Sequence, residues 1–300
     1  MSSRAATERL HERVLEWYST AARDLPWRTD DATPWGIFVS EVMLQQTPVA
    51  RVLPVWVEWM RRWPTPTDLA AQPPGEAVRA WGRLGYPRRA LRLHAAAVAI
   101  TERFDGAVPS TEAELSTLPG VGTYTAAAVA TFAFGERTTV VDTNVRRVLA
   151  RAVTGDAYAA PSPTRAELET AAALVPLEAD RARTWSVAVM ELGALVCSSR
   201  SPRCDACPIR ALCAWRLAGS PAHEGPPRRG QAWEGTDRQM RGALLRVLRE
   251  SDGPVSRERI EAVSSLALQR ERCLDSLVAD GLVEPLARGF YQLPGAREAS

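Results

Sequence analysis

The sequence predicts a mainly α-helical protein that ends in a small mixed α/β unit. Apolar residues recur at helical spacing along most of the 300 residues, whereas the alternation typical of strands is rare. A Gly- and Pro-rich segment, residues 219–235, separates the C-terminal part from the rest. Two short strand-like stretches occur only beyond that segment, so we expect sheet structure in the C-terminal part alone.

The helices before this segment follow from apolar periodicity and from breaks at proline. The first amphipathic stretch ends near Asp24-Leu25-Pro26-Trp27, and Pro48 opens a helix that stops at Trp63-Pro64. We expect helices over residues 7–20, 35–46, 48–63, 76–83, 87–104, 111–117, 123–134, 144–153, 164–175, 180–196 and 208–217.

The last residues, 236–300, predict a compact unit of their own. Residues 237–250 and 267–280 have helical spacing, and Ser256 is a suitable N-cap for a helix between them. Leu282–Pro285 and Phe290–Leu293 form two short strand patterns around Gly289. Three helices and a hairpin resemble a winged helix.

The composition excludes some chemistry but does not identify the function. The net charge is +2, which is only mildly basic, and the 46% apolar content is that of a soluble globular protein. All 37 basic residues are arginine. A biased coding sequence is sufficient cause, but any mechanism that needs a lysine amine is excluded. Met1–Leu10 lacks the apolar core of a signal peptide, and Ala95–Ile100 is too short to cross a bilayer, so we expect a cytoplasmic protein without a membrane partner.

Four cysteines lie within 17 residues in the pattern C-x6-C-x2-C-x5-C: Cys197, Cys204, Cys207 and Cys213. Thiolates bind both zinc and iron–sulfur clusters. Structural zinc sites usually join two cysteine pairs across a longer insert, whereas one short loop favours wrapping a single cubane cluster. Zinc and four unrelated buried cysteines are the alternatives. The fifth cysteine, Cys273, is expected in the core of the C-terminal unit.

A helical hairpin is predicted around Gly120-Val121-Gly122. Thr111-Glu112-Ala113-Glu114 is a capping box for the helix before it, and Thr123 is expected to cap the helix after it. The glycines allow the backbone to approach a partner, and a helix N-terminus attracts phosphate. A plain packing turn between two helices is the alternative.

Two carboxyl groups, those of Glu41 and Asp142, are candidates for catalysis. A general acid needs a carboxyl group whose pKa is raised, as burial among apolar side chains would do. Glu41 lies beside Val42, Met43 and Leu44, which would desolvate it and raise its pKa. Asp142 precedes a helix. A surface glutamate and a plain N-cap aspartate are the alternatives.

Residues 8–217 resemble the MutY-type adenine DNA glycosylases of the endonuclease III, or helix-hairpin-helix, superfamily. The cysteine spacing, Leu-Pro-Gly-Val-Gly and Ser40–Thr47 (Ser-Glu-Val-Met-Leu-Gln-Gln-Thr) carry the resemblance. It implies a two-lobed fold, with a six-helix barrel lobe at 30–138 that contains the hairpin (111–134). Residues 1–29 with 139–217 would form the cluster lobe, and 218–235 a linker. It further implies a [4Fe–4S] cluster on the four cysteines.

The resemblance also implies the residues' roles. Glu41 would protonate adenine N7, Asp142 would stabilise or transiently bond the sugar C1′, and Asn144 would position the water or the acid. Tyr124 stands where bifunctional relatives carry the lysine that nicks DNA. Implied substrate contacts are Arg23, Trp27, Arg28, Leu44, Gln46, Thr47 and Tyr86. Implied DNA-backbone contacts are Gly120, Val121, Gly122, Arg88, Arg89 and Arg200. The implied partner is double-stranded DNA with A·8-oxoguanine or A·G mispairs, bound by a nucleoid-associated monomer.

Two features depart from that family's pattern. Val187 stands where the family often has Glu or Gln as an adenine contact, and the tail lacks the Nudix-like domain with its Phe-Ser-His loop. Two other functions therefore stay open. One is a thymine glycosylase of the same superfamily acting on T·G mismatches, and the other is a non-enzymatic iron–sulfur winged-helix DNA-binding protein.

Overall fold

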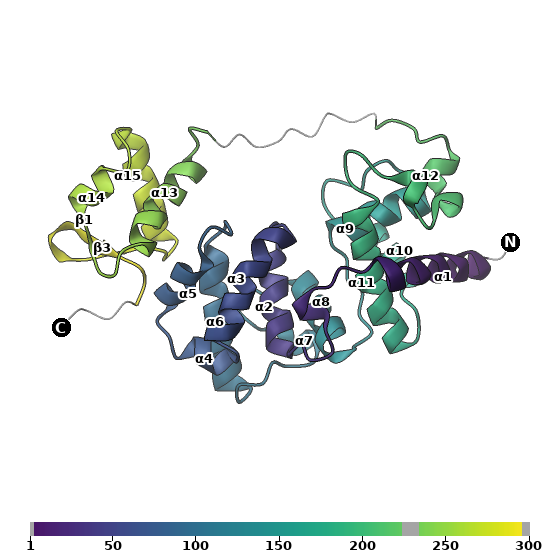
Figure 1. The fold of residues 1–300 in the computed structure, drawn as a ribbon, viewed down its shortest axis with the longest axis horizontal. Coiled ribbons are helices and arrows are strands. Elements are labelled where there is room, and N and C mark those ends of the chain that lie inside the picture. Colours follow the sequence, from purple (N-terminus) through teal and green to yellow (C-terminus); the bar gives the residue numbers. More distant parts are fainter. Residues whose placement is uncertain (1–2, 224–233, 296–300) are drawn as a thin grey trace. The chain divides into compact units, whose positions relative to one another are not determined.

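The computed structural model describes residues 3–223 and 234–295, which are predominantly helical (Figure 1). They form two compact units, one of residues 3–37, 110–116 and 121–223, the other of residues 38–109, 117–120 and 234–295. Of the predicted linker at 218–235, residues 224–233 lie outside the described residues. No helix in the described parts is long and apolar enough to cross a membrane.

The first unit is built around α11 (Ala179–Leu195), which packs against both α1 (Ser3–Ala21) and α9 (Thr143–Leu149). Val14, Ala188 and Leu192 are fully buried in this core. The unit's other helices are α7 (Glu112–Leu115), α8 (Thr123–Phe134), α10 (Arg165–Ala173) and α12 (Ala214–Leu217), with 3-10 turns at Pro26–Arg28, Cys204–Ala206 and Arg210–Leu212. Helix α2 (Pro34–Leu44) begins in this unit and ends in the second.

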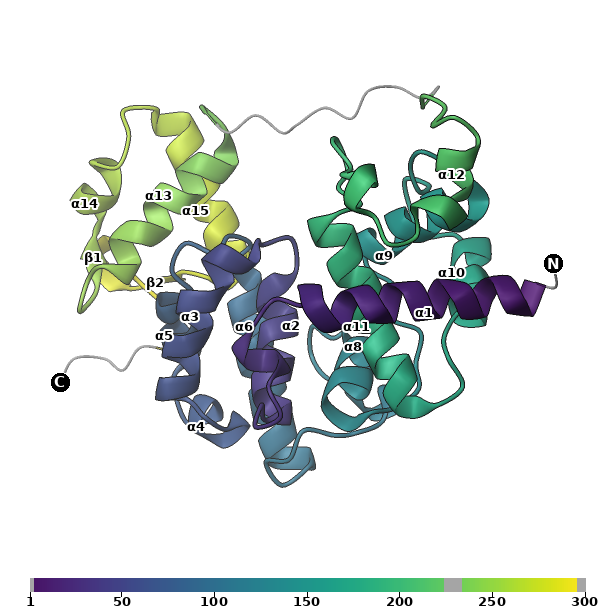
Figure 2. The same cartoon turned by 45° about the vertical axis from the view of Figure 1, so that its right-hand side comes forward.

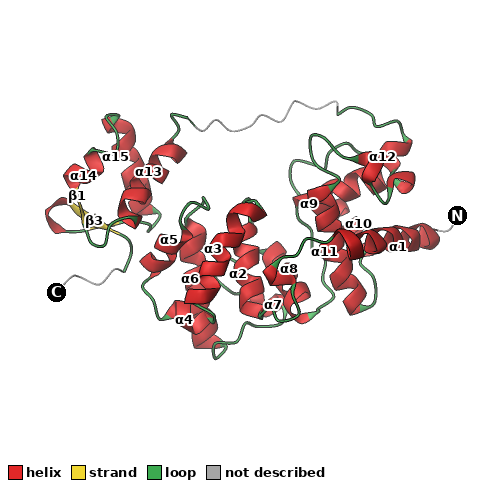
Figure 3. Ribbon diagram, in the orientation of Figure 1, coloured by secondary structure: helices red, strands yellow, loops and turns green. Residues whose placement is uncertain are grey.

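The second unit contains a helical part and the C-terminal elements (Figure 3). Its first helices are α3 (Val49–Arg62), α4 (Pro66–Ala70), α5 (Pro74–Trp81) and α6 (Arg88–Arg103). Helix α6 packs against α4 and α5. The ring of Trp59 makes edge contacts with Trp63 and Trp81, with centroids 4.9 and 5.7 Å apart. These rings join α3 to α5.

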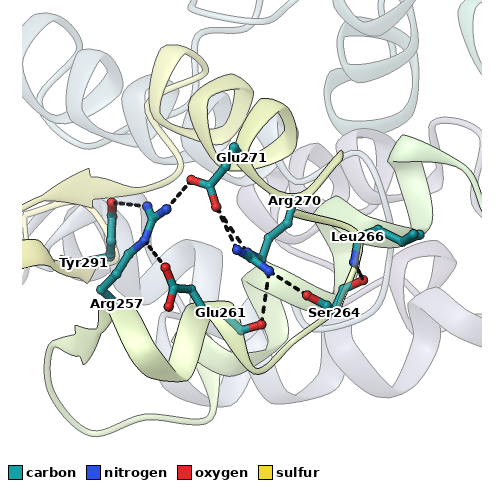
Figure 4. Close-up of polar contacts among 7 residues, drawn as sticks. All are labelled: Arg257, Glu261, Ser264, Leu266, Arg270, Glu271 and Tyr291. Carbon is teal, nitrogen blue, oxygen red and sulfur yellow. Dashed lines mark hydrogen bonds and ion pairs between the residues drawn. The ribbon is translucent and has the colours of Figure 1, made fainter. Parts of the chain in front are cut away.

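The C-terminal elements form three helices and a three-stranded antiparallel sheet of order β1-β3-β2. They are α13 (Asp237–Arg249), β1 (Val255–Ser256), α14 (Arg257–Glu261), α15 (Ala267–Ala279), β2 (Glu284–Pro285) and β3 (Phe290–Gln292). The two expected strands are present, and β1 adds a third that was too short to predict. Figure 4 shows Arg257 of α14 joined to Glu261, to Glu271 of α15 and to the Tyr291 hydroxyl of β3. One guanidinium thus ties two helices to the sheet.

The C-terminal elements lie against α5, as Figure 2 also shows. The Gly75 N–H donates to the Pro294 carbonyl at 2.7 Å, and Arg249 Nε donates to the Val78 carbonyl at 2.9 Å. Arg79 donates to the Ser251 carbonyl at 2.9 Å. A Cβ at Gly75 would lie 2.6 Å from the Pro294 oxygen, so this close approach requires glycine. The C-terminal elements are therefore part of the second unit's packing.

Most predicted helices are confirmed, and the exceptions have local causes. Helix α4 was not predicted because its five residues are too few for apolar periodicity, although Thr65 and Asp68 form a capping box. The predicted helix over 208–217 is a 3-10 turn followed by α12. Thr123 does not cap α8, because Gly122 occupies the N-cap position and Thr123 is its first helical residue.

Candidate active site

Glu41 is a buried carboxyl on α2. Glu41 is 6% exposed, and its neighbours Val42 and Met43 are 5% and 0% exposed. The structure therefore excludes the alternative of a surface glutamate. An apolar, water-poor surrounding favours the protonated form of a carboxyl group, which is the form that a general acid needs.

The loop that follows α2 and the loop before α6 both hold a non-glycine residue in the left-handed backbone region. Gln46 has φ 56° and Tyr86 has φ 46°. This conformation costs an ordinary residue about 1–2 kcal/mol, so surrounding contacts must maintain it. Gln46 is exposed and Tyr86 is 42% exposed, while Thr47 is buried and Leu44 half-buried. The two strained loops therefore present Gln46 and Tyr86 outward.

Arg89 does not lie where an arginine that contacts the DNA backbone was expected. It is only 7% exposed, and its guanidinium faces the protein interior. It donates to five acceptors at 2.6–3.0 Å: the carbonyls of Val42, Met43, Gln45 and Gly85, and the hydroxyl of Thr47. Burial lowers the pKa of Arg89 to about 10, which leaves it charged at neutral pH. The expectation of a phosphate contact is corrected, because these acceptors already use the guanidinium.

The other expected DNA-backbone arginines remain accessible. Arg88 is half exposed and forms an ion pair with Asp280 at 3.3 Å, and Arg200 is exposed in the cysteine loop. Arg238 of α13 lies over the Tyr86 ring, with 5.0 Å from its guanidinium carbon to the ring centroid. Arg238 was not predicted from sequence, because only the folded chain brings α13 to the Tyr86 loop.

Asp142 caps α9 and is desolvated. Its Oδ1 accepts hydrogen bonds from the N–H groups of Asn144 and Val145 at 2.8 and 2.7 Å. Burial raises the pKa of Asp142, and these hydrogen bonds oppose that rise only in part. The residue is therefore the N-cap that the plain interpretation proposed, but it is also a carboxylate whose ionised form is disfavoured by its surroundings.

Asn144 connects Asp142 to an arginine that the sequence analysis missed. Its Nδ2 donates to Asp142 Oδ2 at 2.7 Å, and its Oδ1 accepts from Arg147 Nη2 at 2.7 Å. Arg147 also donates to the carbonyls of Gly193 and Cys197. A Cβ at Gly193 would lie 2.6 Å from the Asn144 Cβ, so the close packing of α11 on α9 depends on glycine there. These contacts fix the orientation of the Asn144 amide.

Tyr124 lies in the first turn of α8. It packs against an apolar cluster that includes Ile37, Val140 and the half-buried Val187. Val140 precedes Asp142 by two residues, so Tyr124 and the Asp142 segment share one supporting surface. Val187 contributes apolar contact to that cluster and carries no hydrogen-bonding group.

Glycine occupies the two hairpin positions, 120 and 122, for different reasons. Gly120 has φ 78°, and a Cβ there would lie 2.6 Å from the Arg92 Cβ, so the fold itself requires glycine. Gly122 is exposed, has an ordinary negative φ, and a Cβ there would meet nothing within 4 Å. The fold does not require Gly122, whereas a close backbone approach to a partner would. Val121 between them is half-buried.

Glu191 of α11 joins Arg23 and Arg28, and sequence reasoning missed it. It is fully buried and accepts three hydrogen bonds from Arg23, two from the guanidinium at 2.6 and 2.7 Å and one from the backbone N–H at 3.1 Å. It also accepts one from Arg28 at 3.0 Å. Burial alone would raise the pKa of Glu191, but the two guanidinium groups outweigh burial and hold it at about 2. Because the folded pKa lies below the unfolded one, this stabilisation is present at neutral pH and is lost as the pH falls through about 4 to 2.

This ion-pair network positions the segment that carries Trp27. Trp27 is buried between Arg23 and Arg28 in the chain, on the 3-10 turn Pro26–Arg28. The two arginines were expected to contact the substrate, and their hydrogen bonds to Glu191 show what orients their side chains. The sequence did not reveal Glu191 as their partner, because it is distant in sequence from both arginines.

The four cysteines of the predicted cluster loop line a single pocket, together with Arg151 and Trp215 among others. The pocket encloses about 400 Å³ of space, part of it open to solvent. No three Cys, His, Asp or Glu side chains among the described residues converge closely enough to hold one metal ion. All four thiols are free and half-buried. Arg151 donates to Cys197 Sγ at 3.4 Å and to the carbonyls of Ser198 and Ser199, which fixes the start of the loop.

The helical fold with its hairpin is that of a class of protein, the DNA glycosylases of base excision repair. Residues 39–173 match the HhH-GPD superfamily of base excision DNA repair proteins. The structure of a thermostable thymine-DNA glycosylase superposes with a TM-score of 0.65 and 28% identity, covering 73% of this chain and 100% of that one. The expected glycosylase fold is confirmed.

Curated relatives narrow the class to a family. The adenine DNA glycosylase of Mycobacterium tuberculosis (strain CDC 1551 / Oshkosh) is 54% identical over 284 residues, which cover 94% of this chain and 92% of the relative. The adenine DNA glycosylase of Mycolicibacterium smegmatis is 54% identical over 286 residues, covering 95% and 96%. The chain belongs to the adenine DNA glycosylase family and is a DNA glycosylase enzyme.

Proposed function

We propose that this enzyme hydrolyses the N-glycosidic bond of adenine mispaired with 8-oxoguanine, or with guanine, in double-stranded DNA. The observation that carries the proposal is Asp142, a carboxyl group whose ionised form is disfavoured by burial. A purely structural N-cap does not need a charged group, because asparagine or serine caps a helix equally well. A cationic sugar in the transition state does need one.

The proposed mechanism divides the work between the two carboxyls. Glu41, buried among apolar side chains, protonates N7 of the extrahelical adenine and so makes the base a better leaving group. Asp142 stabilises the positive charge that develops at C1′. Asn144, oriented by Asp142 and Arg147, holds the water or the acid in place. Tyr124 lies on the apolar cluster beside the Asp142 segment and helps hold the transition state.

The proposal includes monofunctional chemistry, because the chain has no lysine. Strand cleavage by bifunctional relatives proceeds through a Schiff base on a lysine amine, and Tyr124 cannot form one. The product is therefore an abasic site in an intact strand. Hairpin residues Gly120, Val121 and Gly122 contact the DNA backbone together with Arg88 and Arg200, and Leu44, Gln46, Thr47 and Tyr86 contact the mispair. We propose that the monomer acts on nucleoid DNA.

A single-turnover assay with enzyme in excess tests this function. On a duplex with adenine opposite 8-oxoguanine, we expect release of free adenine and a strand that breaks only after hot alkali. Excision opposite guanine should be slower, and a duplex with A·T should remain intact. Unreacted adenine opposite 8-oxoguanine would refute the proposal. Thymine release from a T·G duplex would instead favour the activity of the similar solved protein, a thymine-DNA glycosylase.

We also propose that the four cysteines hold a [4Fe–4S] cluster. The donor set supports it, because the four cysteines line one pocket and thiolates are the protein ligands of iron–sulfur clusters. The bound cluster would order the loop that exposes Arg200, and it takes no part in bond cleavage. The cluster's contribution is therefore structural, like that of Arg151 at the start of the same loop.

Iron content gives a test that does not depend on activity. Anaerobically purified protein is expected to contain about four iron and four sulfide ions per chain. Cys204→Ser should lower both, whereas Cys273→Ala, which changes a buried core cysteine of the C-terminal unit, should leave both unchanged. Zinc in place of iron in anaerobic preparations would contradict the proposal.

A further inference from the structure

Arg89 makes more hydrogen bonds than the packing of its helix requires, which points to a further role for this residue. Its guanidinium is buried, and within the described parts of the chain no carboxylate hydrogen-bonds to it. Every hydrogen bond that the structure gives it goes to a backbone carbonyl or to the Thr47 hydroxyl. Its Nε–H is buried without a partner among the described residues. Burying a charged group costs free energy, so we expect the five hydrogen bonds of Arg89 to have a structural or functional role.

The five acceptors come from two separate segments. Val42 and Met43 lie in the last turn of α2, and Gln45 and Thr47 lie in the loop just beyond it, whereas Gly85 belongs to the loop before α6. Nη1 holds three carbonyls of the first segment, and Nη2 joins Thr47 to Gly85. A single planar guanidinium therefore fixes the spacing of the two segments.

The Arg89 guanidinium binds peptide groups next to the two residues with a left-handed backbone conformation, Gln46 and Tyr86. Gln46 stands between the acceptors Gln45 and Thr47, and Tyr86 follows the acceptor Gly85. Holding the peptide groups beside each of them maintains a backbone conformation that neither residue prefers. Two arginines also lie near the Tyr86 ring: the guanidinium carbons of Arg89 and Arg238 are 5.6 and 5.0 Å from its centroid.

We infer that Arg89 is a positioning residue that sets Gln46 and Tyr86 in one fixed arrangement for reading the base opposite the excised adenine. The inference rests on the proposed function, in which these two side chains contact the mispair. Arg89 itself touches no DNA. It acts through the backbone of both loops, and its planar fork is suited to this because a lysine ammonium cannot reach five acceptors in two directions.

Arg89→Lys tests the inference, since it keeps the charge and loses the fork. Affinity for duplex with A·8-oxoguanine and with A·T is measured by titration, and the excision rate under single-turnover conditions. We expect the ratio of the two affinities to fall about tenfold or more, while excision at saturating enzyme changes less than about threefold. Hydrogen exchange of the loop amides at 45–47 and 84–86 should accelerate. Arg61→Lys, the same exchange at an exposed arginine of α3, should change none of these.

The outcomes separate the inference from the function on which it rests. If wild-type protein does not prefer the A·8-oxoguanine duplex, the proposed function fails. If wild type prefers it and a folded Arg89→Lys variant keeps that preference and the slow exchange of both loops, the inference fails. Thr47→Val is the milder second variant, because it removes one acceptor of the guanidinium and keeps the side-chain shape. It should lower the same affinity ratio by a smaller factor, and an unchanged ratio would also count against Arg89.

Discussion

Replacing Glu41 by glutamine is expected to lower the rate of adenine excision by about 10²–10⁴-fold, the usual contribution of a positioned general acid. Glutamine has nearly the same shape, so the buried site on α2 stays filled. Its amide has no acidic proton to transfer to the leaving base. Adenine protonation is the step that Glu41 performs in the proposed mechanism, and no other acidic side chain of α2 can replace it, because Glu41 is the only Asp or Glu between Pro34 and Leu44.

The measurement for Glu41→Gln is the single-turnover rate on a duplex with A·8-oxoguanine, together with the dissociation constant for the same duplex. Binding should stay within about threefold of wild type, because removal of the proton affects the transition state more than the ground state. Glu58→Gln is the matched control, since Glu58 is exposed on α3 and forms an ion pair with the exposed Arg61 of the same helix. Retention of a tenth or more of the rate by Glu41→Gln would exclude it as the acid.

Sequence was sufficient where chemistry is encoded in a short segment. Glu41 was predicted with its apolar neighbours, and burial of Val42 and Met43 confirms that surrounding. The helical periods and the strands of the C-terminal unit were also local signals. Helix α4 was missed because five residues carry no periodicity, and its capping box was the available clue.

Sequence was insufficient where a residue's partner is distant. Glu191 gives no local sign that it will bind Arg23 and Arg28, since all its neighbours on α11 fit an ordinary helix. Arg89 was expected to contact the DNA backbone, and only the folded loops reveal that its acceptors are internal. Arginines have a particular ambiguity of this kind, because the same guanidinium suits a phosphate and a set of backbone carbonyls.

Asp142→Asn is expected to abolish most activity without a matching loss of stability. The excision rate should fall on the order of 10²–10³-fold, because a charge that stabilises the transition state is removed. The folded protein should remain within about 1 kcal/mol of wild type at pH 7, since asparagine caps a helix as well as aspartate does. Its amide oxygen can keep the hydrogen bonds from the N–H groups of Asn144 and Val145.

The pH dependence of stability gives the sharper part of this prediction. Burial raises the pKa of Asp142 above its unfolded value, so the folded state binds the proton more tightly than the unfolded chain. The contribution of Asp142 to the free energy of unfolding is therefore greatest at low pH and falls as the pH rises through the two pKa values. Asparagine does not titrate, so the variant should lose this decline as the pH rises above the ordinary aspartate pKa of 3.8.

Denaturant unfolding of wild type and Asp142→Asn at several pH values measures the effect, beside the excision rate at pH 7. Asp142→Ala separates cap from charge, because it removes the hydrogen-bond acceptor as well and should cost about 1 kcal/mol more. A structural N-cap would make the asparagine variant active and the alanine variant unstable. A carboxylate retained for catalysis makes both variants inactive and only the alanine variant less stable. Activity in Asp142→Asn would therefore leave Asp142 with the capping function alone.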